Sequence, residues 1–419
     1  MKKAVIIVLI LISSWLSAQD KPDESKYGIK FGGFVKTDAF HDTRQTVSVR
    51  EGHFLLYPDN RLKDANGKDI NDAPNFNILS IQTRLRGVIS GPDAFGAKTS
   101  GLIEADFFGN ENSSFIDANG FRLRHGLVKL NWKKTELMAG QFWHPLFVPE
   151  SYPEVISFNT GAPFQPFTRN PQVRLTVKAG PMKFIAAALS QRDFQTIGAD
   201  GASTKYLRNS QLPNGHVQIQ FQPDSTEHLF GVAADFKQIM PEVYSTGLIN
   251  KNKYRVRTTL DSYTGMGFLK LKFKPFTFKV QIIYAQNGTD LTMIGGFAVR
   301  QYTDSITGAK SYTNLNTGSI WAELTGNGKK IRPAVFFGYS ENMGSDVNFI
   351  IAYGRATNMD HVYRVAPRIV FISSKFNLAL EEEYTYAHFG TLDGSKKGKV
   401  INCKGVENFR TMLSFIYNF

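Results

Sequence analysis

Hydrophobic and polar residues alternate with a period of two along most of this chain, which is typical of β-strands that have one apolar and one polar face. In segment 214–222, for example, His216 precedes Val217, and glutamines separate Val217, Ile219 and Phe221. Sixteen segments of about ten residues show this pattern. They are 28–40, 77–90, 98–109, 121–132, 136–143, 172–179, 182–191, 214–222, 227–238, 262–274, 276–286, 317–325, 329–340, 361–373, 375–387 and 406–419.

The links between these segments alternate between short and long from end to end. The short links carry Gly, Pro, Asn and Ser, the residues of tight turns. The long links are 41–76, 110–120, 144–171, 192–213, 239–261, 287–316, 341–360 and 388–405. Short turns at one end and long loops at the other are typical of a transmembrane antiparallel β-barrel. The sequence therefore predicts an all-β barrel of about sixteen strands.

The two faces of the strands then have different surroundings. An Arg or Lys that faces lipid at mid-membrane costs about 2–4 kcal/mol, so the polar faces must line the lumen. A barrel of sixteen strands leaves an aqueous channel rather than a filled core. Glu381, Glu382 and Glu383 are consecutive, so at least one of them must point outward.

Both ends of the sequence support export to a membrane. Lys2 and Lys3 precede an apolar run and the small pair Ser17-Ala18, which predicts a signal peptide over 1–18. We expect a short segment over 19–27 and a barrel over 28–419 in the bacterial outer membrane. The last strand ends on the aromatic residue Phe419, which we expect the barrel assembly machinery to recognise.

Composition narrows the function. The formal net charge is +13, which fits either a channel that attracts anions or a merely basic secreted protein. Cys403 is the only cysteine, so no internal disulfide forms. No motif for nucleotide binding or structural zinc occurs, and we expect no cofactor, no metal and no nucleic-acid partner.

Arginines recur on the faces that we assign to the lumen, and clustered basic residues in a pore favour anions. Each arginine could instead pair with inward acidic residues, such as Glu104, Asp106, Asp235 and Glu323, as an ordinary cross-strand salt bridge. The inward arginines are Arg84, Arg86, Arg122, Arg124, Arg174, Arg364, Arg368 and Arg410.

The third long link, 144–171, is rich in Pro and aromatic residues, unlike a solvated loop. Such a segment must pack against something. We expect it to fold into the lumen as a constriction, with Glu150, Glu154 and Arg169 near the narrow point. The alternatives are a cap on the barrel rim and a contact between subunits.

Several motifs resemble those of the DcaP-like trimeric outer-membrane porins, with weaker similarity to the phosphate-selective porins O and P. They are GGFVKTDAF from Gly32, FRLRHGLVKL from Phe121, GQFWHPLF from Gly140, PESYPE, SFNTGAPF, RNPQVR from Arg169, RVAPRIVF and LALEEEYTYA. The resemblance implies a homotrimer and passive diffusion of small anions such as dicarboxylates or phosphate. By motif position, Arg122, Arg124, Arg169 and Arg174 resemble basic pore residues of this family.

Two other classes of function remain open from the residues alone. One is a secreted or outer-membrane β-rich protein that binds glycans and forms no channel. The other is a barrel enzyme acting on lipid, for which His125 and His144 are the candidate residues. That enzyme would need a nucleophile and a base within hydrogen-bond reach on the lipid-facing wall.

Overall fold

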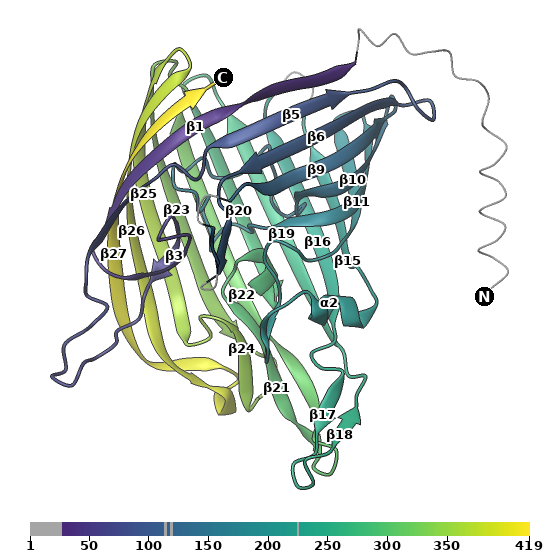
Figure 1. Cartoon of the computed structure of the whole chain (residues 1–419), viewed down its shortest axis with the longest axis vertical. Coiled ribbons are helices and arrows are strands. Elements are labelled where there is room, and N and C mark those ends of the chain that lie inside the picture. The colour runs from purple at the N-terminus through teal and green to yellow at the C-terminus, as the bar shows by residue number, and fades with distance from the viewer. Residues whose placement is uncertain (1–26, 113–114, 118–119, 224–225) are drawn as a thin grey trace.

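The computed structural model describes residues 27–112, 115–117, 120–223 and 226–419. Most of these residues belong to one antiparallel sheet that closes on itself (Figure 1). The predicted signal peptide and nearly all of segment 19–27 lie outside the described residues. No helix among the described residues is long and apolar enough to cross a membrane.

The sheet closes into a barrel of 16 antiparallel staves. The first stave, β1 (Gly28–Asp42), pairs with the last, β27 (Lys399–Asn418), from Phe34↔Asn418 to Asp42↔Arg410. β4 (Asn75–Leu79) and β5 (Arg84–Ser90) both pair with β1 and together form the second stave. The others are β6 (Lys98–Asp106), β9 (Arg122–Asn131), β10 (Thr135–Trp143), β11 (Arg169–Ala179), β12 (Met182–Leu189), β15 (Asn214–Phe221), β16 (Leu229–Ile239), β19 (Leu260–Lys272), β20 (Phe276–Gln286), β22 (Ala309–Gly326), β23 (Ile331–Gly344), β25 (Met359–Ser373) and β26 (Phe376–Asp393).

Each predicted strand corresponds to one stave, so the predicted fold class is confirmed. Two predicted loops are wrong in extent. Segment 388–405 is mostly strand, because β26 and β27 continue to pair as far as Asp393↔Lys399. Segment 287–316 contains β21 (Gly295–Asp304), which pairs with the long β22 and with β24 (Ile351–Arg355).

The remaining elements lie in the long loops. The first long loop folds back as a hairpin of β2 (Thr46–Val49) and β3 (Phe54–Pro58). The others are β7 (Asn110–Asn112), β8 (Phe115–Asp117), β13 (Ile197–Gly198), β14 (Gly201–Ala202), α2 (Lys205–Ser210), β17 (Tyr244–Thr246), β18 (Lys253–Arg255), and the 3-10 turns η2 (Gly288–Leu291) and η3 (Gly394–Lys396). β1 begins and β27 ends at the barrel end that carries the short turns (Figure 1). In an outer-membrane barrel this is the periplasmic end.

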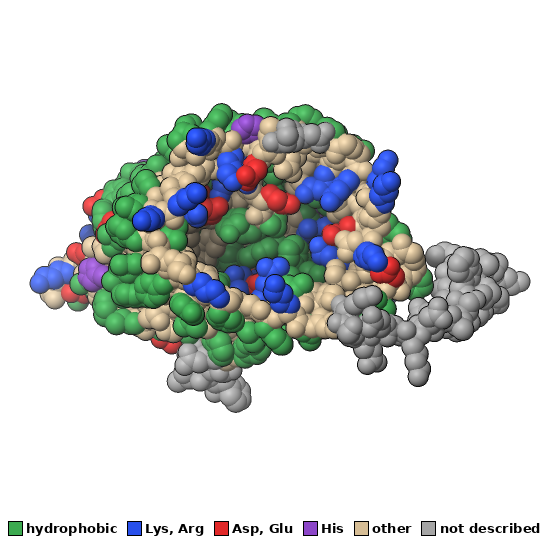
Figure 2. Space-filling view, turned by 90° about the horizontal axis from the view of Figure 1, so that it is seen from above, with side chains coloured by type: hydrophobic (Ala, Val, Ile, Leu, Met, Phe, Trp, Pro, Cys, Tyr) green, Lys and Arg blue, Asp and Glu red, His purple; other side chains and the backbone are tan. Residues whose placement is uncertain are grey.

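The two faces of the wall differ as the alternation predicts. On β27, Asn408, Arg410 and Ser414 are fully buried toward the lumen, whereas Phe415 and Tyr417 are exposed on the outside. The outer wall is dominated by exposed apolar side chains, and Figure 2 shows hydrophobic side chains around the outer surface at the short-turn end. Such a surface requires a lipid environment.

The three consecutive glutamates of β26 point to both faces of the wall, as their sequence requires. Glu381 and Glu383 are fully buried on the lumen side. Glu382 lies on the outer face, where its carboxylate accepts a hydrogen bond from the Thr411 hydroxyl at 2.7 Å.

Candidate functional site: the lumen and its inward-folded loop

The third long loop, residues 144–168, is here called L3, and it crosses the inside of the barrel. Leu146 and Val148 pack against the lumen side of β16, β19 and β20. Farther along, the main-chain N–H of Glu154 donates to Glu323 on β22, and that of Ile156 donates to Glu381 on β26, both at 2.8 Å. L3 therefore reaches the barrel wall opposite its origin.

L3 is anchored by an aromatic cluster inside the lumen. Its Phe158, Phe164 and Phe167 pack with Trp321 and Phe336 of the β22–β23 wall. The hairpin of the first long loop adds buried side chains to the same cluster. Viewed from the short-turn end, the barrel is hollowed, with hydrophobic side chains deep in the hollow and charged ones around it (Figure 2). The lumen therefore opens at the short-turn end as a hollow, here called the vestibule.

Two of the predicted pore arginines hold L3 in place. The Arg364 guanidinium donates to the carbonyl of Ala162 in L3 at 3.0 Å and to that of Leu56 in the first loop at 2.8 Å. Arg368 pairs with Glu323 at 2.9 Å. Both arginine side chains are buried. Their hydrogen bonds and ion pairs therefore join one part of the protein to another.

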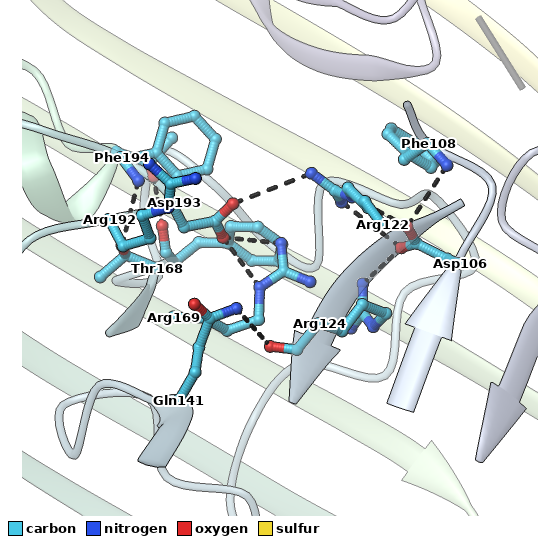
Figure 3. Close-up of polar contacts among 12 residues, drawn as sticks. Asp106, Phe108, Arg122, Arg124, Gln141, Thr168, Arg169, Arg192, Asp193 and Phe194 are labelled. Atoms are coloured by element: carbon cyan, nitrogen blue, oxygen red, sulfur yellow. Dashed lines mark hydrogen bonds and ion pairs between the residues drawn. The ribbon is translucent and has the colours of Figure 1, made fainter. Parts of the chain in front are cut away.

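Four of the predicted pore arginines gather at the base of L3. Arg122 and Arg124 both bind Asp106, each at 2.8 Å (Figure 3). Arg169, the first residue of β11 directly after L3, binds Asp193 of the fourth long loop at 2.6 Å (Figure 3). The neighbouring Arg84 and Arg124 share the carboxylate of Glu104.

This arginine cluster (Arg84, Arg122, Arg124 and Arg169) is cross-linked but not neutral. Its four guanidinium groups face the three carboxylates of Glu104, Asp106 and Asp193. The side chains of Arg84 and Arg122 keep about a fifth of their surface exposed, 21% and 23%. The cluster therefore presents excess positive charge to the lumen.

Of the remaining predicted arginines, Arg410 is buried and pairs with Asp42 at 2.6 Å. Arg86 and Arg174 lie nearer the short-turn end. Arg86 is exposed. Arg174 donates to the main-chain carbonyl of Trp143 at 2.7 Å and lies over the ring of Phe142. Arg174 thus braces the end of β10, directly before L3 begins.

Four lysines that the sequence did not single out lie on the lumen side of the wall near L3. Lys178 on β11 is the direct cross-strand partner of Lys183 on β12. Lys270 on β19 is likewise the direct partner of Lys279 on β20. Like charges placed directly opposite each other are destabilising, so each pair calls for a counter-charge.

L3 supplies one carboxylate to each lysine pair. Glu150 binds Lys183 at 3.1 Å, and Glu154 binds Lys279 at 2.8 Å. Lys178, Lys183 and Glu150 line one cavity of about 460 Å³ beside the short turns. Lys279 also lies 3.5 Å from Glu323, which pairs with Arg368. One carboxylate thus faces Lys178 and Lys183, and two carboxylates face Lys270, Lys279 and Arg368. Basic groups outnumber carboxylates at both places, which leaves each able to attract a further anion. Alternation along segment 172–179 puts Lys178 on the same inward face as Arg174. Only the strand register shows that Lys178 lies opposite Lys183.

The two histidines considered for a lipid-directed enzyme are both buried. His144 lies at the start of L3, 3.5 Å from Asp235 on the lumen side. His125 packs against Phe142 and Trp143. Neither ring lies on the lipid-facing wall.

A closed barrel of sixteen antiparallel strands, with an apolar outer wall, a charged lumen and an inward-folded loop, is the fold of the bacterial outer-membrane porins. No protein-family model matches the sequence, and no curated protein matches it. Among solved structures, the chain is similar to the outer membrane channel DcaP of Acinetobacter baumannii. That match has a TM-score of 0.66 and 16% identity, and it covers 96% of this chain and 100% of that chain.

Two other solved structures match over nearly the whole chain. An anion-selective porin from Comamonas acidovorans gives a TM-score of 0.54 at 10% identity, over 94% of this chain and 100% of that one. OmpT of Vibrio cholerae, in a trimer form, gives 0.55 at 9% identity, over 94% and 99%. At these identities the similarity shows the fold, and the function has to be argued from the lumen itself.

Proposed function

We propose that this protein is an outer-membrane porin through which small hydrophilic anions, such as dicarboxylates or phosphate, diffuse passively. The observation that carries the proposal is the surplus of cationic groups along the lumen. Two cross-strand lysine pairs share one L3 carboxylate each in the vestibule. The arginine cluster then holds four guanidinium groups against three carboxylates at the base of L3. Basic groups along a pore favour anions and raise their local concentration.

L3 is the constriction in this proposal. It spans the lumen and is fixed to the wall by the buried carboxylates of Glu323 and Glu381. Deleting residues 150–166 should therefore raise single-channel conductance several-fold. Unchanged conductance would mean that L3 does not limit the flow of ions.

We further propose that the protein works as a homotrimer embedded in outer-membrane lipid, and that the strand ending in Phe419 is recognised during barrel assembly. The chain is similar in fold to the outer membrane protein OmpT of Vibrio cholerae, which was solved in a trimer form. Cross-linking in mild detergent followed by mass determination tests the trimer, and monomers alone would contradict it.

The test of the transport proposal is solute entry into liposomes that contain the purified protein. Succinate or phosphate should enter faster than a cation of similar size, and lysine pairs converted to glutamine should lose that difference. Equal rates for both charges would contradict the anion preference. Absence of swelling with either solute would contradict the channel.

A further inference from the structure

Two histidines lie directly opposite each other on neighbouring strands at the long-loop end of the barrel. His361 near the start of β25 is the cross-strand partner of His388 near the end of β26. The residues beside them, Val362 and Ala387, are fully buried on the lumen face. The histidines therefore face outward, with 25% and 28% of their side-chain surface exposed.

An acidic residue joins them because the strand is irregular there. Consecutive residues of a strand normally point to opposite faces, so Asp360 would be expected to face away from His361. The β25–β26 register shifts between Met359 and His361, and a β-bulge of this kind re-aims a side chain. As a result, Asp360 Oδ2 lies 2.8 Å from Nδ1 of His361 and 3.4 Å from Nδ1 of His388.

We propose that Asp360, His361 and His388 form a binding site for a divalent transition metal, with Zn²⁺ as the best fit. The three ligand atoms lie within 4.8 Å of one another. Tetrahedral Zn²⁺ with bonds of about 2.0–2.1 Å separates its ligand atoms by roughly 3.4 Å, close to the observed spacings. Imidazole nitrogens with one carboxylate oxygen suit Zn²⁺, Cu²⁺ and Ni²⁺ better than Mg²⁺ or Ca²⁺. Solvent would supply the fourth ligand, because the group is open to the outside.

The rings are held in place before any metal arrives. His361 stacks between Tyr339 and Tyr386, with interplanar angles of 27° and 28°. His388 also stacks on Tyr386, at 27°. Little side-chain freedom is then lost on binding, which favours affinity.

A second group of similar composition, His144, His216 and Asp235, lies buried in the lumen. There the His144 ring is engaged on both nitrogens. Its Nδ1 accepts a hydrogen bond from the main-chain N–H of Leu146 at 3.2 Å, and its Nε2 lies 3.1 Å from the Asn214 amide. That group fixes the start of L3, so the proposal concerns the outward site alone.

A metal at the outward site would join the ends of β25 and β26 beyond the lipid-facing part of the barrel. Metal binding would replace the hydrogen bonds that now join the two histidines to Asp360. A ligand that binds only the folded barrel also raises its unfolding temperature. The site thus predicts a melting temperature that depends on metal.

Zinc titration calorimetry on the untagged, detergent-purified full-length protein at pH 7.5 tests the proposal. We expect one Zn²⁺ per chain, with at least tenfold weaker binding in His361→Ala and in His388→Ala and weaker binding also in Asp360→Asn. Saturating Zn²⁺ should raise the melting temperature of the wild type and leave that of His361→Ala/His388→Ala unchanged. His41→Ala, which removes another exposed histidine of the outer wall, should bind Zn²⁺ like the wild type.

Three results would overturn the site. One is the absence of saturable binding by the wild type at equimolar Zn²⁺. Another is wild-type Zn²⁺ affinity in the double histidine variant. That result would overturn the outward site even if His216→Ala, in the buried group, also left Zn²⁺ binding intact. The third is displacement of Zn²⁺ by an equal concentration of Mg²⁺. Because the melting temperature without metal shows whether each variant has folded, loss of binding in a folded variant is informative.

Discussion

The buried carboxylate of Glu381 on β26 accepts a hydrogen bond from the main-chain N–H of Ile156 in L3, at 2.8 Å. The next N–H, that of Ser157, donates to the same carboxylate at 2.8 Å. The barrel wall thus binds the loop through its backbone. Because the acceptors belong to the wall, the position of L3 depends on residues more than 200 positions away along the chain.

Removing this carboxylate should loosen L3. Glu381→Ala leaves two buried N–H groups without an acceptor, at a cost of about 1–3 kcal/mol for each. We expect higher and noisier single-channel conductance in planar bilayers. Glu382→Ala is the matched control, since Glu382 lies on the outer face and bonds Thr411. Equal single-channel conductance and equal current noise in the two variants would show that Glu381 does not hold the constriction.

Asp193 limits the anion preference of the arginine cluster, because it pairs with Arg169 at 2.6 Å and lies 3.8 Å from Arg122. Asp193→Asn keeps the side-chain shape and removes one negative charge. The chloride-to-potassium permeability ratio should rise about twofold to fivefold, the effect of an energy near ~1 kcal/mol at a partly solvated site. Asp200→Asn, an exposed residue of the same loop paired with Lys205, should leave the ratio unchanged. A lower ratio in Asp193→Asn would contradict the role of the cluster.

The lysine pairs are expected to set selectivity from the vestibule. Lys178→Glu and Lys270→Glu reverse one charge in each pair, opposite Lys183 and Lys279. Each variant should lower the chloride-to-potassium permeability ratio, and the double variant should approach or pass equality. High salt should shrink the difference, because screening lengths fall to about 3 Å at 1 M. Lys98→Glu serves as the control, because Lys98 lies at the start of β6 beside a short turn and pairs with the exposed Asp93.

Glu150 offers a pH test of L3. Burial alone would raise the pKa of Glu150, but the charge and hydrogen bond of Lys183, together with the charge of Arg174, outweigh burial and hold the pKa below the ordinary value of 4.5. A depressed pKa keeps the carboxylate charged, and the ion pair intact, at every pH above 4.5; both are lost only as the pH falls through the lower value.

The charge of Glu150 can be followed as the difference in reversal potential between wild type and Glu150→Gln. This difference should stay constant from pH 8 to about 5 and vanish only below 4.5. In a Lys183→Met background it should vanish at a higher pH. A difference that disappears between pH 5 and 7 in the wild-type background would contradict the ion pair.

The alternation of residues was enough to predict every stave of the barrel, because one face of each strand must meet lipid. The alternation did not predict how far the strands extend beyond the membrane. Gly390 breaks the alternation, yet β26 and β27 stay paired to Asp393 because backbone hydrogen bonds need no apolar face. Strand length beyond the lipid is therefore set by pairing and is not visible in the pattern.

The sequence predicted that basic side chains would face the lumen, but it did not predict which groups they bind. The inward placement of Arg364 follows from its strand, but its partners are carbonyl groups of Leu56 and Ala162, in two distant loops. The pairing of Lys178 with Lys183 depends on a register that only the structure gives. The role of each predicted arginine in selectivity remains a prediction.

The central claim is that the lumen conducts ions and prefers anions. The most direct measurement is the reversal potential of the wild-type protein in a planar bilayer with a tenfold KCl gradient at neutral pH. The proposal predicts channels whose reversal potential lies toward the chloride equilibrium potential. A reversal potential toward that of potassium, or a protein that inserts without conducting, would contradict it.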